Sequence, residues 1–427
     1  MTKQIVWIIL GLLAALILIV YSLNFYFMSH LNVNQNVGGD TSYGKAASTK
    51  SGYFHQLKKR VRSLKPIYLN RNPQYYRIRN KVWRNFEPKT YENVTLVWDI
   101  SYWWPSDNDL FPALDTTMGQ LLNALRNEEI IAARNAPKGT QLKLLLTLAG
   151  KQKVIFKPKW YERTEVIDGP VYSGKDRFNA EIIAFYLGAI LDMRWTPVAV
   201  GRKINLSEIY ENKADKLLRS TMTVNDDQTK YCVYGKCFYC KETEDVCGDD
   251  EHLLEGVVLY LVPGSFEKYR SPWQRTYKEN HLAPWEENMD YCVPLKDKLS
   301  YTRLLDLADV AIFDFLIQNG DRHHYETRED RVVLIDNGKG FGNPNVDHID
   351  ILAPLYQCCV LRKSTWDRLL FFSGGTLTEL LDQVSKRDLL YPLLTNDHYK
   401  AIERRLLMVY AAVEACFDRF GKETVLT

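Results

Sequence analysis

The sequence predicts an α+β protein of two lobes, a small lobe rich in strands and a larger, mainly helical lobe. With 427 residues the chain is long enough for one large two-lobed domain or for two ordinary domains. Two β-type runs flank Ala149-Gly150 and predict a hairpin in the first half of the chain, at residues 141–148 and 153–157. Helical apolar spacing dominates the second half. The helices predicted there are 301–318, 349–356, 364–372, 376–385 and 399–420.

The charge balance gives no reason to expect a nucleic acid partner. The chain has 55 Lys and Arg against 52 Asp and Glu, a net charge of only +3. A local basic cluster, Lys58-Lys59-Arg60, could contact a sulfated or phosphorylated partner, but such runs are usually solvated surface. We therefore predict that no nucleic acid binds this chain.

The N-terminus has the composition of a membrane anchor. Residues 5–23 contain no charged side chain and are mostly Ile, Leu, Val and Ala, and a bilayer-spanning helix needs about 20 such residues. A cleaved signal peptide is the alternative, but bulky residues such as Phe25 follow the run where a cleavage site needs small ones. Because Lys3 precedes the run and the next Lys is Lys45, we predict a cytoplasmic tail at 1–4, a transmembrane signal anchor at 5–27 and a lumenal body.

Two further features agree with a lumenal body. Asn93-Val94-Thr95 and Asn205-Leu206-Ser207 fit the acceptor pattern for N-glycosylation. Residues 28–90 are rich in Asn, Gly, Ser, Lys and Arg and lack sustained apolar periodicity. This composition predicts a lumenal stem with one helix.

The segment 91–262 is predicted to form the small lobe and the hinge. Lys157 closes the second strand of the hairpin, and Glu181 adjoins the apolar face near the start of the helical segment 177–193. A strand lysine followed by a helix glutamate can form the ion pair that orients nucleotide phosphates in kinases. The β-type run Leu254–Val262 is suited to the hinge, and the helical C lobe then occupies 263–427.

The eight cysteines all lie beyond residue 230, and four of them crowd into the run CVYGKCFYCKETEDVC. The Cys237-x-x-Cys240 step has the spacing of zinc ligands and of thiol redox motifs as well as of a disulfide loop. Zinc would suit a cytosolic chain, and a redox motif would need a βαβ context that the sequence lacks. In a lumenal body, a disulfide-stapled loop is the favoured interpretation.

The stretch from Ala308 to Gly342 carries the chemistry. A predicted helix ends at Asn319-Gly320, the polar loop Asp321–Glu326 follows, and a short β-type run delivers Asp336 into a turn. Phosphoryl transfer needs one carboxylate to accept the proton of the acceptor hydroxyl and another to hold the metal. The chain has Glu326 where ordinary protein kinases have a metal-binding Asn, and it lacks their G-x-G-x-x-G, H-R-D and D-F-G motifs. A structural Asp-Arg pair beside a capped strand end is the alternative.

At this point the sequence resembles a known family, the atypical kinases of the secretory pathway, which include the Golgi casein kinase and the glycosaminoglycan xylosylkinase. The resemblance runs from about Pro112 to Phe420. It rests on the motifs DRHHYE with the following DNG turn, FKPK, NAEIIAF, GKCFYC and PLYQCC. The longer runs FKPKWYERTEV, GKCFYCKETE, KGFGNP and ILAPLYQCCVLRKSTW are most similar to the xylosylkinase branch.

The resemblance implies a kinase-like two-lobed fold in a single-pass type II membrane protein of the Golgi. It implies ATP as donor, Mn²⁺ (or Mg²⁺) as metal, and the 2-hydroxyl of xylose in the galactose-xylose linker of proteoglycans as acceptor. Asp321 would be the catalytic base, with Glu181 and Asp336 as metal ligands. The implied nucleotide contacts are Gln141, Lys157, Leu259, Tyr260, Leu261, Val262, Glu326 and Asp336. The implied disulfides are Cys232–Cys247, Cys237–Cys240, Cys292–Cys358 and Cys359–Cys416.

Two other functions stay open within the same family. The turn Asp336-Asn337-Gly338 is shared with the casein kinase branch, and Phe178 replaces a histidine of the xylosylkinase pattern. A secreted-protein serine kinase is therefore the first alternative. An allosteric pseudokinase partner is a weaker one, because the family's pseudokinase departs from the pattern at the helix Glu and this chain retains Glu181. Dimers with itself or with relatives are compatible with either.

Overall fold

The computed structural model describes residues 52–427, apart from residues 138, 279–280 and 330. The predicted tail and signal anchor at 1–27 and the first part of the predicted stem lie outside the described residues. Among the residues that are described, no helix combines the length and the apolar character needed to cross a bilayer. The chain divides into two units, Met1–Tyr53 and Phe54–Thr427.

The structure differs from the predicted stem between residues 54 and 90. This stretch contains helical residues 54–61, α3 (Pro66–Leu69) and α4 (Tyr75–Asn85), and it belongs to the same compact unit as the rest of the body. Some of its apolar side chains are buried: Tyr68 stacks on Tyr410 with ring centroids 5.0 Å apart, and Tyr75 packs edge-on against Phe372. The polar composition hid this packing because only one narrow face of each helix is apolar.

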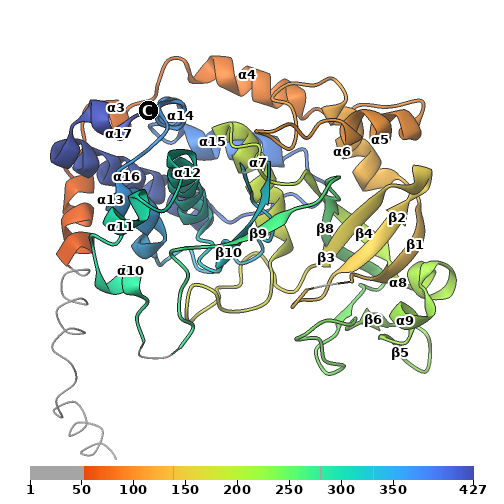
Figure 1. Cartoon of the computed structure of the whole chain (residues 1–427). Coiled ribbons are helices and arrows are strands. Elements are labelled where there is room, and N and C mark those ends of the chain that lie inside the picture. Colours follow the sequence, from red (N-terminus) through yellow and green to blue (C-terminus); the bar gives the residue numbers. More distant parts are fainter. Residues whose placement is uncertain (1–51, 138, 279–280, 330) are drawn as a thin grey trace, which may run out of the picture. The chain divides into compact units, whose positions relative to one another are not determined.

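A five-stranded antiparallel sheet forms the centre of the small lobe, with strand order β1-β2-β3-β8-β4 (Figure 1). Its strands are β1 (Ile130–Asn135), β2 (Leu144–Leu148), β3 (Lys153–Pro158), β4 (Ala199–Asn205) and β8 (Leu253–Tyr260). The predicted hairpin is present, joined by the short helix η1 (Ala149–Lys151), where Gly150 has a φ of +74°. The first strand starts at Leu144 and not at Gln141. A tight turn with positive φ suits glycine, which lacks a Cβ.

Helices pack against this sheet. The predicted helix 177–193 is α7 (Phe178–Leu191), and it contacts β4 and β8, as does α6 (Met118–Asn127). Thirteen of the fourteen residues of α7 are buried, including Glu181 in its first turn. An almost wholly buried helix holds a charged side chain only where that charge is paired. The neighbouring helix α5 (Val94–Tyr102) packs on α6.

A second, smaller sheet follows β4 and includes the ends of the cysteine-rich run 232–247. Its strands are β5 (Met222–Val224), β6 (Tyr231–Val233) and β7 (Val246–Cys247), preceded by α8 (Leu206–Glu208), η2 (Ile209–Lys213) and α9 (Lys216–Arg219). Cys232 lies directly opposite Cys247 in the β6–β7 ladder, and the two form a disulfide.

The C-terminal half is mainly helical, with α12 and α16 as its longest described helices (Figure 1). Its helices are α10 (Pro284–Glu287), α11 (Val293–Lys296), α12 (Tyr301–Ile317), η3 (Ile349–Leu352), α13 (Ala353–Cys358), α14 (Lys363–Leu370), α15 (Thr376–Ser385), α16 (Asn396–Phe420) and α17 (Lys422–Val425). Disulfides join Cys292 to Cys358 and Cys359 to Cys416. The helix predicted at 376–385 is α15 with the same ends, and the one predicted at 349–356 is η3 followed by α13. The other predicted helices are present with shifted ends.

One part of the central stretch differs from the prediction. Residues predicted as the end of a polar loop belong to a strand, β10 (His324–Arg328), which pairs with β9 (Glu267–Arg270) and β11 (Arg331–Val333). Tyr325 and Thr327 are buried while their neighbours are partly exposed, the period of two of a half-buried strand. The polar letters of this run masked that alternation.

Candidate active site

Lys157 is the centre of a cluster of carboxylates. This residue, near the end of β3, is 4% exposed, and its ammonium lies 2.6 Å from Glu181, 2.6 Å from Asp336 and 3.2 Å from Asp176. Burial alone would lower the pKa of Lys157, but the three carboxylates together raise it well above its ordinary value. The lysine is therefore held as a cation at this position.

Asn337 fixes the carboxylate of Glu181 in this cluster. Its backbone N–H donates to one oxygen of Glu181 and its side-chain amide donates to the other, both at 3.1 Å. The same amide also donates to the carbonyl oxygen of Leu334, 3.0 Å away. The residue after Asp336 thus ties the turn to the start of α7, although its type alone did not predict this role.

Asp336 occupies an unusual backbone conformation, with a φ of +60°. Non-glycine residues rarely adopt it, so the surrounding contacts must hold it there. The Lys157 ammonium, 2.6 Å away, keeps the pKa of Asp336 far below its usual range. The carboxylate is therefore charged at neutral pH and can bind a cation.

Asp321 lies on the loop that follows α12, and its carboxylate accepts a hydrogen bond of 2.7 Å from the hydroxyl of Tyr277. Asn319 connects the two aspartates: its side-chain oxygen accepts from the Asp321 N–H at 3.3 Å, and its amide donates to the Asp336 carbonyl at 3.3 Å. Burial raises the pKa of Asp321, an effect that the Tyr277 hydrogen bond partly offsets. A raised pKa makes this carboxylate a better proton acceptor.

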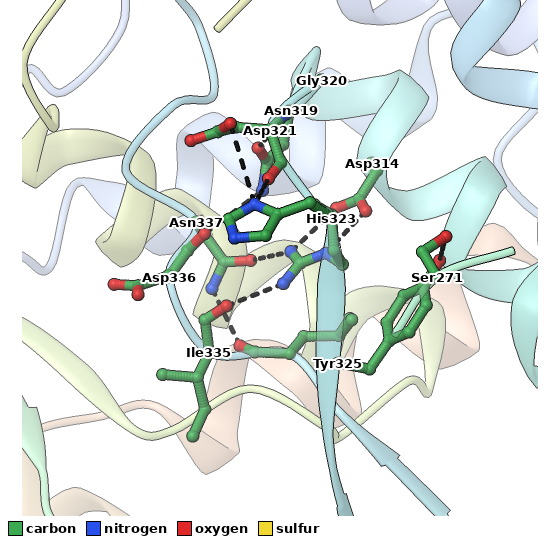
Figure 2. A network of polar contacts seen from close by, with 12 residues as sticks. Ser271, Asp314, Asn319, Gly320, Asp321, His323, Tyr325, Ile335, Asp336 and Asn337 are labelled. Carbon is green, nitrogen blue, oxygen red and sulfur yellow. Dashed lines mark hydrogen bonds and ion pairs between the residues drawn. The ribbon is translucent and has the colours of Figure 1, made fainter. Parts of the chain in front are cut away.

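Arg322 connects the loop to α12 and to the turn after Asp336. Its guanidinium pairs with Asp314 of α12 and donates at 2.7 Å to both the Ile335 carbonyl and the Asn337 side chain. In Figure 2 the carboxylates of Asp321 and Asp336 project to the same side of this network. The alternative of a purely structural Asp321-Arg322 pair therefore does not hold, because Arg322 binds Asp314.

The remaining predicted site residues lie at differing distances from the cluster. Glu326 lies on β10. Its pKa is raised mainly by burial and further by the charge of Asp336. Leu259 and Tyr260 end β8, beside β3, and Leu261 and Val262 follow them. Gln141 lies before β2 and lines a separate hollow with Trp160 and Lys175. Within the part of the chain that the structure describes, no hydrogen bond joins Gln141 to the Lys157 cluster.

The four disulfides of the structure are the four pairs that the resemblance implied: Cys232–Cys247, Cys237–Cys240, Cys292–Cys358 and Cys359–Cys416. All eight cysteines are paired, so none remains as a thiolate ligand for zinc. The two predicted glycosylation asparagines both cap short helices. Asn93 is exposed and caps α5, and Asn205 is partly buried and caps α8.

Several functional side chains were not identified from the sequence. Asp176, Asn319, Asn337 and Tyr277 all contact the predicted catalytic or metal-binding residues. Asn319 and Asn337 adjoin the predicted aspartates in sequence, which was a usable signal. Asp176 and Tyr277 lie 19 and 44 residues from the side chains they contact, so no local pattern marks them.

The cluster has the donor set of a divalent metal site. Three carboxylates face a single ammonium, which leaves an excess of negative charge beside the exposed side of Asp336. Carboxylate oxygens are the ligands that Mg²⁺ and Mn²⁺ prefer. Glu181, Asp336 and Asp176 are therefore the carboxylates of this cluster that could hold such a metal.

The site pairs a strand lysine with a helix glutamate, and one aspartate that follows a helix and one that follows a strand lie next to them. This arrangement defines a phosphotransferase of the kinase class. The chain belongs to the Fam20 family of Golgi kinases. The family model described as "Golgi casein kinase, C-terminal, Fam20" matches residues 96–425, which include the whole cluster.

Known relatives agree with this assignment. The chain is 56% identical to the glycosaminoglycan xylosylkinase homolog of Drosophila melanogaster over 98% of both chains. It is 43% identical to the glycosaminoglycan xylosylkinase of Homo sapiens, over 79% of this chain and 85% of that one. A structure of hydra Fam20 with sugar superimposes with a TM-score of 0.73 at 42% identity, covering 78% of this chain and 98% of that one. A structure of the Golgi casein kinase with Mn/ADP bound has a TM-score of 0.73 at 31% identity, covering 83% and 89%.

Proposed function

We propose that this chain transfers the γ-phosphoryl group of ATP to the 2-hydroxyl of xylose in the linker between glycosaminoglycan and core protein. The observation that carries the proposal is the 56% identity, over 98% of both chains, to a xylosylkinase homolog. The site supports it, because a buried lysine, a metal-type carboxylate cluster and a separate carboxylate of raised pKa lie together. These are the parts that phosphoryl transfer to an alcohol needs.

Asp321 would act as the general base. The acceptor hydroxyl would donate its proton to Asp321 while its oxygen bonds to the γ-phosphorus and ADP leaves. Tyr277 holds the Asp321 carboxylate through a 2.7 Å hydrogen bond, and the Asn319 amide restrains the two aspartate loops relative to one another. These contacts would orient the base before the acceptor binds.

The nucleotide would lie between the small lobe, 91–262, and the C lobe, 263–427. Glu181 and Asp336 would hold Mn²⁺ or Mg²⁺, which neutralises charge on the phosphates when bound. Lys157 would contact the phosphates, Glu326 and Gln141 would contact the nucleotide, and the segment from Leu259 to Val262 would face the adenine. The Golgi casein kinase structure with Mn/ADP supports this choice of metal and nucleotide.

A hollow beside Asp321 is our candidate for the acceptor site. Its cavity volume is about 50 Å³, room for one part of the sugar and not for a whole ring, and its lining includes Arg275, Tyr277 and His323. Trp273 and Trp285 line it too, but both are buried and use their indole N–H groups on neighbouring protein atoms. Their rings form the wall of the hollow and do not present an exposed face on which a sugar could stack. The sugar would therefore be bound mainly by the polar side chains of Arg275, Tyr277 and His323.

The proposal is tested by giving the purified body ATP and Mn²⁺ with two acceptors side by side. We expect phosphate on a galactose-xylose acceptor and none on an acidic Ser-containing peptide, and the reverse result would establish the secreted-protein serine kinase instead. Asp321→Asn should reduce turnover by about 100-fold or more, whereas Asp367→Asn, at an exposed pair with Lys363, should not. Equal and negligible rates for wild type and Asp321→Asn would favour the pseudokinase alternative.

We also propose the finer topology. Residues 5–27 would anchor the chain as a single-pass type II protein of the Golgi membrane with a lumenal body. Glycans at Asn93 and Asn205 would agree with this, since each would require lumenal exposure. Treatment of the cellular protein with an N-glycosidase, combined with protease protection of intact vesicles, tests both points. Light scattering of the purified body tests for a homodimer or a dimer with a relative.

A further inference from the structure

A small cavity lies beside the connection between β3 and α7. Its volume is about 30 Å³. Three segments line it: residues 167–173, Gln318 at the end of α12, and residues 342–348. Arg177, the N-cap residue of α7, also lines the cavity. The cavity therefore lies where the chain before Glu181, the helix before Asp321 and the chain after Asp336 meet.

The guanidinium of Arg177 is only partly satisfied by the protein. Arg177 is 5% exposed, its Nε donates to the Gly340 carbonyl at 2.6 Å, and its Nη2 donates to the Lys339 carbonyl. Its Nη1 is buried and has no hydrogen-bond partner among the residues that the structure describes. A buried donor of a charged group without a partner costs free energy, so such a group is normally paired.

Glycine at position 342 keeps this region open. A Cβ on Gly342 would lie 3.2 Å from the Cζ and the Nη2 of Arg177 and 3.3 Å from its Nη1. Any larger residue would therefore press on the guanidinium from the cavity side.

Among the described residues, no carboxylate side chain lines the cavity itself, and Asp168, between two lining residues in sequence, accepts a hydrogen bond from one of the two N–H groups of the Asn343 amide at 3.4 Å. Its polar side chains besides Arg177 are Ser173, Gln318, Asn343 and His348, and the oxygen of Gln318 already accepts from the His348 backbone. Burial lowers the pKa of Arg177 to about 10, because the charge of the adjacent Asp176 offsets only part of it. Asp176 itself turns toward Lys157, 3.2 Å away. Arg177 therefore donates to carbonyl oxygens and forms no ion pair with a described carboxylate.

We propose that this cavity binds a chloride ion, held by Nη1 of Arg177 and by the neighbouring polar groups of Ser173 and Asn343. The size selects the ligand class. One water needs about 10–15 Å³ of such volume, so about 30 Å³ admits a monatomic anion and its hydration but not a phosphate with four oxygens. The donors also match: a guanidinium, a hydroxyl and an amide N–H all bind anions.

A bound anion would stiffen the active site from behind. Val171, from the cavity wall, packs so closely on Gly320 that a Cβ there would lie 2.1 Å from it. The next residue, Tyr172, packs edge-on against Tyr277 with ring centroids 4.8 Å apart, and Tyr277 donates to Asp321. The anion would hold residues 167–173 against residues 342–348, and so would hold the support of the catalytic base.

Bromide replaces chloride and is directly visible by anomalous diffraction. Crystals of the wild-type body grown or soaked in sodium bromide should show an anomalous peak beside Nη1 of Arg177. A site that contains only water, with no anomalous signal at saturating bromide, would overturn the proposal. This measurement needs no variant and does not depend on the reaction that the enzyme catalyses.

The second test compares the Tm of the protein in sodium chloride with its Tm in sodium gluconate at equal ionic strength. With chloride tenfold above its Kd, Tm should rise by about 2 °C for the wild type. Arg177→Gln should abolish the rise, whereas Arg368→Gln should keep it. Arg368 is a matched control, because it also donates to a backbone carbonyl and has a pKa lowered by burial to about 10, but it does not line the cavity. An equal rise in Arg177→Gln would refute the site.

The effect on turnover rests on the proposed function and is measured separately. Chloride should raise the rate of phosphoryl transfer in the wild type, and Gly342→Ala should weaken that response. If no acceptor is phosphorylated but the bromide peak is present, the proposed function fails and the anion site stands. If transfer proceeds equally in chloride and gluconate and no peak appears, the anion site fails alone.

Discussion

The guanidinium of Arg322 forms two hydrogen bonds with the carboxylate of Asp314, at 2.6 and 2.9 Å, and both side chains are only 5% exposed. Asp314 lies in α12, eight residues before Arg322, so the pair closes the loop that carries Asp321. A bidentate, buried pair of this kind fixes direction as well as distance. Because Arg322 pairs with Asp314, the Asp321 carboxylate can accept the hydrogen bond from Tyr277 and bind the acceptor hydroxyl.

Breaking this pair should destabilise the whole body. Asp314→Asn leaves a buried guanidinium without its counter-charge, which typically costs about 3–5 kcal/mol. The free energy of unfolding from guanidinium chloride titration checks this. Asp367→Asn, which removes the exposed pair with Lys363, is the control and should cost about 1 kcal/mol or less. A loss below about 1 kcal/mol for Asp314→Asn would mean that the pair is not buried in solution.

Tyr277 should set the pH dependence of the reaction. Its hydrogen bond favours the charged form of Asp321, so Tyr277→Phe should raise the pKa of Asp321 further above its ordinary value. Since the base must be deprotonated, the acidic limb of the kcat/KM profile should move to higher pH. Tyr239→Phe, in the exposed disulfide loop, should leave the profile in place. A change in rate without a shift of the limb would indicate a purely structural role.

Glu181 should control activation by the metal. Glu181→Gln removes one of the three carboxylates that face Lys157. We expect activation by Mn²⁺ to require about 10- to 100-fold more metal, because the donor set loses a charge. The Mn²⁺ dependence of ATP turnover measures this. Glu162→Gln, at an exposed pair with Lys159, is the control. An unchanged Mn²⁺ requirement would remove Glu181 from the metal site.

His398 should make stability depend on pH. This residue of α16 is buried. Its Nε2–H donates to the Phe341 carbonyl oxygen at 3.0 Å, and the Thr395 hydroxyl donates to its Nδ1 at 2.7 Å. Burial lowers the pKa of His398 to about 4. The unfolded chain therefore binds more protons between about pH 6.5 and 4, and the free energy of unfolding should fall as the pH falls through that window.

The variant His398→Gln isolates this contribution. The wild type should lose up to about 3 kcal/mol of stability across the window, since one pKa unit corresponds to about 1.4 kcal/mol. His398→Gln should show a smaller slope, and His55→Gln, at an exposed position, should show the wild-type slope. Parallel pH profiles for wild type and His398→Gln would assign the slope to other groups.

Much of the fold followed from local patterns. The hairpin that carries Lys157, the helix that carries Glu181 and the helix before Asp321 are present with ends shifted by a few residues. Local sequence was misleading where a chain segment has a polar composition but a narrow buried face. The helices of residues 54–90 and the strand β10 are the two cases, and both are ordered by contacts with distant elements.

The site was predicted unevenly for the same reason. Residue type and order identified Lys157, Glu181, Asp321 and Asp336, because each follows or occupies an element with a recognisable pattern. Asp176 and Tyr277 escaped notice, since their roles depend on side chains 19 and 44 residues away.

The sequence by itself determined the elements, the acids and bases they carry, and the cysteines available for pairing. Backbone hydrogen bonding and the alternation of faces act over a few residues, so they can be read locally. Only the tertiary structure decided which charges meet. Lys157 and Asp336 are 179 residues apart, and their 2.6 Å contact depends on packing α7 between the small lobe and the helices after residue 301. The partner of Arg322 and the unpaired Nη1 of Arg177 were decided in the same way, because burial and distance between remote segments set them.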